Sequence, residues 1–408
     1  MESIKRKRSL IGKADEQTMY SVLVLIGIAH LLNDSLQAVV PAMFPILERS
    51  LGLTFTQLGL IAFTLNMIAS VMQPVIGSFT DKHPRPYVLP IGMISSMFGM
   101  LLLSIAPNFY FILLSVVFIA IGSATFHPEG SRVAYMAAGP RRGFAQSIFQ
   151  VGGNAGQSLA PLITALVLVP LGQFGTIWFT LVAGLAVIML FYIASWYKGQ
   201  LLTRQNEKRL SRKETSTAPK KKLRQAVILL IFIVFARSWY HSAMGNFYAF
   251  YVIDKYEASI ANAQLFIFIF LFMGAIGTFL GGPIADRFGK KNVIVLSLLG
   301  PAPFALLLPY VGYQLALVLL AVIGFLLMSS FSVAVVYAQE LNPGKIGTMS
   351  GLIVGFAFGM GAIGSIVFGS VIDAFGIMLT MIVVSLLPLI GTLAFFLPSD
   401  KKIKSWYN

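Results

Sequence analysis

The chain has 408 residues, of which 57% are hydrophobic and only 11% carry a charged side chain. Water-soluble domains are about 45–50% apolar and about 25% charged, so this composition excludes an ordinary soluble enzyme and indicates a polytopic membrane protein. The absence of Cys excludes disulfides, cysteine nucleophiles and cysteine metal ligands. The net charge of +15 must be interpreted from where the basic residues lie.

Twelve stretches are long and apolar enough to cross a membrane as helices, because a transmembrane helix needs about 20 mostly apolar residues. The first six are predicted at residues 19–47, 56–79, 87–106, 109–138, 144–169 and 176–197. The last six are predicted at residues 225–253, 263–285, 292–311, 315–340, 347–372 and 377–397. The sequence therefore predicts an all-α polytopic membrane protein with two groups of six helices.

The basic residues are distributed unevenly between the two sides of the predicted membrane. If successive helices alternate in direction, 26 of the 30 Lys and Arg residues fall on the side that holds both termini. The positive-inside rule then places both termini in the cytoplasm. The net positive charge is therefore a consequence of membrane topology. We expect the basic residues to contact anionic membrane lipids rather than nucleic acid. The predicted segments are a tail (1–18), a bundle (19–197), a basic cytoplasmic linker (198–224), a second bundle (225–397) and a tail (398–408).

An internal repeat follows the second helix of each group. Asp81 and Asp286 occupy equivalent loops and are 205 residues apart, about half the chain. The second copy, Gly-x-x-x-Asp-Arg-x-Gly-Lys-Lys, resembles the loop signature of the major facilitator superfamily, whereas Pro84 replaces glycine in the first copy. The resemblance implies two pseudo-symmetric six-helix halves that transport by alternating access around a site between them. The candidate gating residues are Asp81, Arg85, Asp286, Arg287, Lys290 and Glu340.

A closer resemblance is to the drug-efflux branch of that superfamily that confers fosmidomycin resistance. It is carried by His30-Leu-Leu-Asn-Asp34, Phe126-His-Pro-Glu129, Ser131-Arg-Val-Ala134, Gln146 to Asn154, and Tyr337-Ala-Gln-Glu340. The resemblance implies proton-coupled antiport of a small anionic antibiotic, such as the phosphonate fosmidomycin, out of a bacterial cell. It also implies a multi-pass protein of the plasma membrane that uses the proton gradient and no cofactor. We expect a monomer.

Ionisable side chains in mid-membrane are costly and normally face a cavity or a partner, so they mark candidate functional sites. In the first predicted helix, four polar residues at i, i+3, i+4 and i+7 share one face: His30, Asn33, Asp34 and Gln37. In the seventh, a basic stripe occupies the equivalent place of the repeat and contains Arg237, Tyr240 and His241. A rise of about 1.5 Å per residue places both stripes near the middle of the membrane.

The fourth and fifth predicted helices add further polar residues. Glu129 and Arg132 are three residues apart on the fourth helix and are close enough to pair. The alternative is that this helix ends at Phe126 and that residues 127–132 form a cytoplasmic loop, although residues 133–138 are again apolar. On the fifth helix, four polar residues at near-helical spacing are interleaved with glycines, a pattern that serves either a cavity wall or close helix packing: Ser147, Gln150, Asn154 and Gln157.

We assign proton coupling to Asp34 and Glu129, because a carboxylic acid removed from water can load a proton on one side and release it on the other. Arg132 and Arg237 suit a phosphonate or carboxylate, since a guanidinium stays charged and donates two parallel hydrogen bonds. The other candidate substrate-binding residues are His30, His127, His241, Asn33, Gln37, Tyr240, Gln150 and Asn154. Structural alternatives remain open: Asp34 could bond neighbouring helices, and Arg237 could form an ion pair that locks the halves.

Three functional classes are compatible with these residues. The first is a proton-coupled exporter, the second a transporter or facilitator of a metabolite organic anion or phosphate ester, and the third a membrane enzyme or channel. No catalytic residue or metal ligand is assigned, because the sequence lacks His-Glu-x-x-His, Walker and dinucleotide-binding motifs. A two-fold repeat with gating loops favours rocking over a fixed pore. The residue chemistry predicts a small anion and proton linkage, whereas the substrate and the direction rest on the resemblance.

Overall fold

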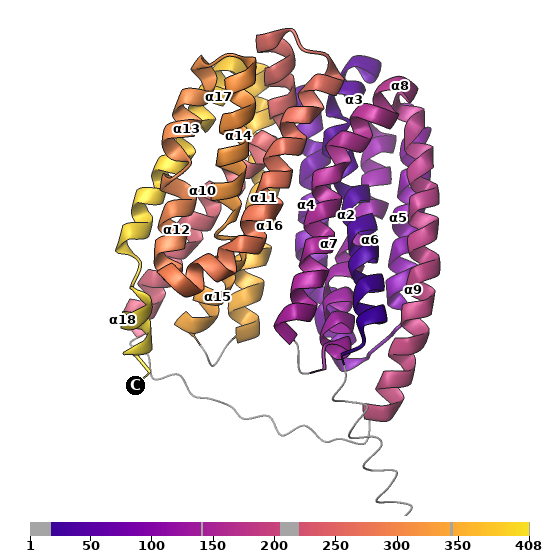
Figure 1. The fold of residues 1–408 in the computed structure, drawn as a ribbon. Coiled ribbons are helices and arrows are strands. Elements are labelled where there is room, and N and C mark those ends of the chain that lie inside the picture. Colours follow the sequence, from indigo (N-terminus) through magenta and orange to yellow (C-terminus); the bar gives the residue numbers. More distant parts are fainter. Residues whose placement is uncertain (1–17, 140–141, 205–219, 343–345, 408) are drawn as a thin grey trace, which may run out of the picture.

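The computed structural model describes residues 18–139, 142–204, 220–342 and 346–407. These residues form helices and no strand, and the helices lie in two bundles side by side (Figure 1). Within them, eleven helices are long and apolar enough to cross a membrane, and a further apolar helix, Val88–Ser104, has 17 residues. The prediction of an all-α protein with twelve transmembrane helices in two halves is confirmed.

The first half contains six spans, drawn in indigo to magenta in Figure 1. They are formed by α2 (Tyr20–Ala42) with α3 (Phe44–Leu51), α4 (Phe55–Lys82), α5 (Val88–Ser104), α6 (Phe109–Ala137), α7 (Arg142–Ile163) with the π-turn η1 (Thr164–Leu168) and α8 (Val169–Leu171), and η2 (Gln173–Thr176) with α9 (Ile177–Arg204).

The second half also contains six spans and ends in a short helix beside them. They are formed by α10 (Lys220–Tyr256), α11 (Ile260–Phe288), α12 (Lys290–Leu299) with α13 (Ala302–Leu307) and η3 (Leu308–Tyr310), α14 (Tyr313–Met328) with α15 (Phe331–Leu341), α16 (Ile346–Phe375), and α17 (Ile377–Val384) with η5 (Leu387–Phe396), followed by α18 (Asp400–Lys404).

Several spans that the sequence predicts as single helices are interrupted. The first breaks at Met43, two residues after Pro41, because proline lacks an N–H group and crowds the preceding turn. In contrast, α6 runs without interruption through Pro128, so residues 127–132 lie in a helix and not in a loop. The predicted linker is shorter at both ends, since α9 extends to Arg204 and α10 begins at Lys220.

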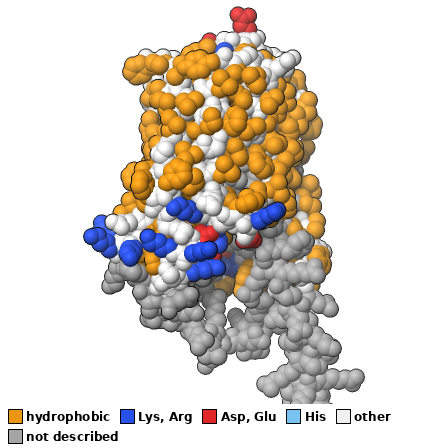
Figure 2. All heavy atoms as spheres, turned by 60° about the vertical axis from the view of Figure 1, so that its left-hand side comes forward, with side chains coloured by type: hydrophobic (Ala, Val, Ile, Leu, Met, Phe, Trp, Pro, Cys, Tyr) orange, Lys and Arg blue, Asp and Glu red, His pale blue; other side chains and the backbone are white. Residues whose placement is uncertain are grey.

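The outer surface has the distribution of side chains expected for a protein in a bilayer. Figure 2 shows a broad belt of hydrophobic side chains, with Lys and Arg gathered below it, toward the end where the C-terminus lies in Figure 1. An acidic side chain stands at the opposite end. On this face of the outer surface, the charged side chains therefore lie outside the apolar belt, as expected when a hydrocarbon layer surrounds it.

The two halves contact each other mainly through two helix pairs, α4 with α16 and α7 with α11. At the end away from the C-terminus, α4 and α16 touch backbone to backbone, because a Cβ added to Gly59 would lie 2.4 Å from the carbonyl oxygen of Ser365. At the same end, Asp373 of α16 accepts hydrogen bonds from Phe55 and Thr56 of α4. A further hydrogen bond between the halves joins α11 to α2, because the side chain of Gln264 donates to the carbonyl oxygen of Ala42 at 2.8 Å.

Within the first half, α7 packs unusually closely on α2, and glycines allow it. A Cβ on Gly156 would lie 2.2 Å from the carbonyl oxygen of Leu31. A Cβ on Gly153 would lie 2.5 Å from Nε2 of His30 and 2.9 Å from Oδ2 of Asp34. The small residues of α7 therefore bring its backbone against the polar face of α2, and this contact shapes the site described next.

Candidate functional site

A cavity of about 220 Å³ lies between the two halves. Its walls come from α2, α4, α6 and α7 of the first half and from α10, α11, α14, α15 and α16 of the second. The first half contributes Gln37, Asn66, Gln73, His127, Gln150, Asn154 and Gln157 to the polar part of the lining. The second half contributes Arg237, Ser238, His241, Ser242 and Asn246. Among the described residues, the lining includes no carboxylate and one permanent positive charge, so the cavity suits an anion.

Arg237 is the unusual group in this lining. Its side chain is only 3% exposed, and its guanidinium lies 4.9 Å from the centre of the Phe331 ring. Among the residues that the structure describes, no hydrogen-bond partner satisfies Nη2, and no carboxylate pairs with the charge. An unpaired buried charge is destabilising, so a group kept in this state at a cavity wall needs an explanation outside the chain. An anionic ligand in the cavity would supply the missing acceptors.

Asp34 lies behind the opposite wall and is the centre of a second cluster. Its carboxylate is almost completely buried, and side-chain amides surround it. Gln157 donates to Oδ2 at 2.8 Å, Asn33 donates to Oδ1 at 3.0 Å, and Gln37 donates to Oδ1 at 3.4 Å. Three amide donors from α2 and α7 thus stabilise a carboxylate that is itself shielded from the cavity.

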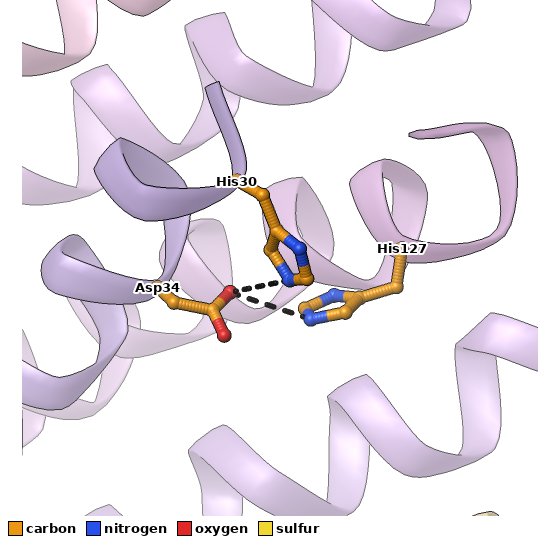
Figure 3. Close-up of side chains that lie close together, drawn as sticks. All are labelled: His30, Asp34 and His127. Atoms are coloured by element: carbon orange, nitrogen blue, oxygen red, sulfur yellow. Dashed lines mark ion pairs between the residues drawn. The ribbon is translucent and has the colours of Figure 1, made fainter. Parts of the chain in front are cut away.

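Two imidazoles complete this cluster. Nε2 of His30 and Nε2 of His127 each lie 3.4 Å from the same oxygen, Oδ1 of Asp34, and Figure 3 shows both rings turned toward it. His30 is buried and stacks on Phe149 with 4.0 Å between ring centres. His127 is 22% exposed and lines the cavity. The cluster therefore connects to the cavity through His127.

The other ring nitrogens determine where the protons are. Nδ1 of His30 lies 2.6 Å from the carbonyl oxygen of Phe149, and Nδ1 of His127 lies 2.9 Å from that of Ser123. A carbonyl oxygen only accepts, so both Nδ1 atoms must carry hydrogen. In the neutral rings, both Nε2 lone pairs would then face the Asp34 carboxylate. One additional proton between Oδ1 and either Nε2 would turn one of these two contacts into a hydrogen bond, so the cluster offers a place for a proton.

The same three groups also meet a simple count for a metal site, since their ligand atoms lie within 4.8 Å of one another. Histidine nitrogens and carboxylate oxygens are common zinc ligands. However, the N–H groups of Asn33 and Gln37 already point at Oδ1 of Asp34, where their positive ends would face a cation. The donor set favours a proton, and the absence of a metal stays a prediction.

The structure separates Glu129 and Arg132 from the cavity. Nη1 of Arg132 lies 2.8 Å from Oε1 of Glu129 and donates to the carbonyl of Thr80 at 3.0 Å. Glu129 is fully buried and also accepts from the hydroxyl of Tyr197 at 3.4 Å. This ion pair joins α6 to α4 and α9. The proton and substrate roles that the sequence suggested for these two residues stay predictions. Their contacts are those of an ion pair between a fully buried carboxylate and a partly exposed guanidinium.

Other predicted site residues have mixed locations. Gln37, Gln150, Asn154 and His241 line the cavity together with Arg237. Tyr240 does not: it is buried inside the second half and lines a separate small cleft with Met244 and Tyr248.

The predicted gating residues lie at the end that holds the C-terminus. Lys290 forms an ion pair with Glu340 at 3.0 Å, within the second half. Arg85, Asp286 and Arg287 are exposed. The side chain of Asp81 lies outside the described part of the chain. A gating role stays a prediction for all six.

The sequence prediction missed several cavity residues. Asn66 and Gln73 are seven residues apart on α4, a spacing that places both on one helix face and was a usable signal. Gln157 of α7, in contrast, already belongs to the polar series predicted on the fifth helix, and it lines the cavity. Ser242 and Asn246 follow the cavity-lining Ser238 at successive four-residue steps along α10.

Comparison with known proteins agrees with this architecture. The family described as Major Facilitator Superfamily matches residues 24–365. The chain belongs to the major facilitator superfamily. As a member of that superfamily it is a multi-pass membrane transporter of small molecules and not an enzyme.

Relatives of this transporter cover nearly its whole length. An uncharacterized MFS-type transporter of Bacillus subtilis, YfnC, is 64% identical over 96% of both chains. The fosmidomycin resistance protein of Escherichia coli is 45% identical over 94% of both chains. The crystal structure of a bacterial homologue of the human lysosomal transporter Spinster has the same fold, with a TM-score of 0.75 at 16% identity over 95% of this chain and 98% of that one.

Proposed function

We propose that this transporter exports small organic anions, such as fosmidomycin, in exchange for protons. The observation that carries the proposal is Arg237, a buried guanidinium at the cavity wall whose Nη2 has no partner in the described chain. A guanidinium can donate two parallel hydrogen bonds to a phosphonate or a carboxylate, which neutral solutes cannot match. A cavity of about 220 Å³ is below the usual size of drug pockets and fits a small solute.

The coupling ion in this proposal is a proton held by the cluster of Asp34, His30 and His127. Alternating access requires that substrate and proton favour different states of the same protein. In the proposed cycle, the anion binds at Arg237 while the cluster is unprotonated, and the halves then rock to expose the cavity to the other side. Proton uptake by the cluster there releases the anion and drives the return.

The direction and the antibiotic substrate rest on the relatives and not on the geometry. The Escherichia coli relative is named for fosmidomycin resistance, and resistance to a drug is consistent with export. We place the transporter in the bacterial plasma membrane with both termini in the cytoplasm. The gathering of Lys and Arg at the C-terminal end of the belt supports this orientation (Figure 2).

A second candidate is transport of a metabolite organic anion or phosphate ester. It is favoured by the unspecific chemistry of the cavity lining. Arg237 can bind any small anion, and the amides of Gln150, Asn154 and Asn246 can form hydrogen bonds with many polar groups. The same fold would then serve a different solute, in either direction.

Flux measurements in proteoliposomes distinguish the two candidates. The purified transporter is reconstituted with an internal pH indicator, and an outward gradient of fosmidomycin, a phosphate ester or a carboxylate is applied. We expect fosmidomycin efflux to carry protons inward, and an imposed pH gradient to accumulate the drug against its own gradient. If fosmidomycin moved no protons while a metabolite anion did, the second candidate would replace the first.

A further inference from the structure

The substrate in the cavity cannot touch Asp34 directly. Asp34 is 2% exposed and is not part of the cavity lining. Three side chains both line the cavity and contact its carboxylate, namely Gln37, His127 and Gln157. Apart from the direct Coulomb interaction between the two charges, any influence of proton and substrate on each other's binding must pass through these side chains or through the backbone that holds them.

Gln157 makes the strongest of these contacts. Its Nε2 lies 2.8 Å from Oδ2 of Asp34, whereas the contacts of Gln37 and His127 to Oδ1 are 3.4 Å long. In the described chain it is also the one side chain that donates to Oδ2. A charged acceptor strengthens such a hydrogen bond, so the bond weakens when a proton neutralises the cluster.

The chemistry of the contact fixes which way the amide is turned. A carboxylate only accepts, so the NH₂ group of Gln157 must face Asp34 and its carbonyl oxygen must face away. The described residues give this side chain no other hydrogen bond, and its remaining surface lines the cavity. While Asp34 is charged, Gln157 is therefore held with an acceptor available to a bound molecule.

We propose that Gln157 is the positioning residue that couples substrate to proton, and that it selects anions carrying an N–H or O–H donor away from the charged group. The inference rests on the proposed function and deepens it. Arg237 holds the anionic group whatever the state of the cluster. The donor end of the substrate bonds to Gln157 only while Asp34 is charged, because protonation releases the amide to turn. Proton binding thereby weakens substrate binding, which is the sign that exchange requires.

The other ionisable groups around Asp34 do not replace Gln157 in this role. His30 on α2 and His127 on α6 are the groups that face the carboxylate. Glu129, Arg132 and Tyr197 contact one another elsewhere in the first half. Arg237 and His241 of α10 line the same cavity from the second half, and α7 presents no ionisable group to Asp34 among the described residues.

The test compares Gln157→Leu with Asn154→Leu. Asn154 also lines the cavity from α7, three residues away, but it makes no described contact with Asp34. Binding of fosmidomycin, which carries an anionic and a donor group, is measured by titration calorimetry across pH 5 to 8, alongside drug-driven proton flux. Wild-type affinity should fall as the pH is lowered. Gln157→Leu should bind about 2- to 10-fold more weakly at high pH, as expected for one lost hydrogen bond, and should keep only the pH dependence that ionisation of the phosphonate itself causes.

Asn154→Leu shows whether the effect is specific to the side chain that contacts Asp34. Asn154→Leu should change affinity by a similar factor at every pH and keep the wild-type pH dependence. A normal pH dependence in Gln157→Leu, or its loss in Asn154→Leu as well, would overturn the inference. If Gln157→Leu is unstable, Gln157→Glu provides the second variant, because a second carboxylate beside Asp34 should move the pH dependence to higher pH. An unmoved profile in that variant would equally overturn it. A wild type without any proton flux would instead contradict the proposed function itself.

Discussion

Asp373 of α16 caps the first turn of α4 across the boundary between the two halves. Its carboxylate accepts from the backbone N–H of Thr56 at 2.7 Å and from the Thr56 hydroxyl at 2.5 Å, and it also accepts from the N–H of Phe55 at 3.0 Å. The first N–H groups of a helix have no partner within it and carry the positive end of its dipole. A carboxylate from the opposite half therefore fastens this end of the molecule with three hydrogen bonds.

This contact predicts that Asp373→Ala opens the end of the transporter that lies away from the C-terminus. These three bonds are exposed to solvent, which makes each worth less than the about 1.5–3 kcal/mol of a shielded hydrogen bond to a charged group. Losing all three should still shift the balance between open and closed forms about 10-fold. The chain has no Cys, so spin labels can be attached after Ser50→Cys and Asp254→Cys and their separation measured by pulsed electron resonance. We expect a longer distance to become populated.

Asp400 provides the matched control for that experiment. It accepts from the backbone N–H of Lys290 at 2.7 Å, so it caps α12 as Asp373 caps α4, but both partners belong to the second half. Asp400→Ala should leave the distance between the labelled halves unchanged. An equal shift in both variants would show that loss of any helix cap loosens the protein, and not that Asp373 is a latch.

Removal of the two intramembrane arginines should affect different properties, namely drug binding for Arg237 and stability for Arg132. Arg237→Ala should weaken fosmidomycin binding about 10- to 100-fold, the value of a charged hydrogen bond, without lowering thermal stability. Arg132→Ala should lower stability, because it strands the fully buried Glu129, and breaking a buried pair costs about 3–5 kcal/mol. Binding assays and thermal unfolding of the purified variants measure both effects. A stable Arg132→Ala with lost drug binding would return Arg132 to the substrate site.

Continuous apolar runs in the sequence predict where the membrane spans lie, although not the break at Met43 in the first of them. The i, i+3, i+4 spacing places His30, Asn33 and Asp34 on one face of that span. Spacing along one helix does not say which neighbour that face meets. His127 and Gln157 reach Asp34 from α6 and α7, and this depends on how closely glycines let α7 approach α2.

The long helix α10 also shows that residue spacing along one helix does not determine which neighbours its side chains meet. Arg237, His241 and Gly245 lie four residues apart and line the cavity, whereas Tyr240, Met244 and Tyr248 form the next stripe and pack inside the second half. The two stripes are about 60° apart around the helix, since three residues rotate it by about 300°. A pattern of i+3 and i+4 neighbours joins them into one face, and only the packing of the adjacent helices separates them.

Replacing the proposed proton acceptor should uncouple transport without abolishing it. Asp34→Asn keeps an oxygen that can accept from Gln157 but cannot take up a proton near neutral pH. We expect exchange of labelled for unlabelled fosmidomycin across proteoliposomes to persist, while a pH gradient no longer accumulates the drug. If accumulation driven by the pH gradient survived in this variant, the proton would have to be carried by another group.

The close approach of α7 to α2 predicts a sharp difference between two glycines that face the site. A Cβ on Gly153 would lie 2.5 Å from Nε2 of His30, whereas a Cβ on Gly245, a cavity-lining residue of α10, would meet nothing within 4 Å. Contacts below 3.0 Å force atoms to move, so Gly153→Ala should displace the imidazole from Asp34 and reduce proton-driven accumulation of the drug to background. Gly245→Ala should transport normally. Full activity in Gly153→Ala would mean that the arrangement of His30 and Asp34 is not needed for coupling.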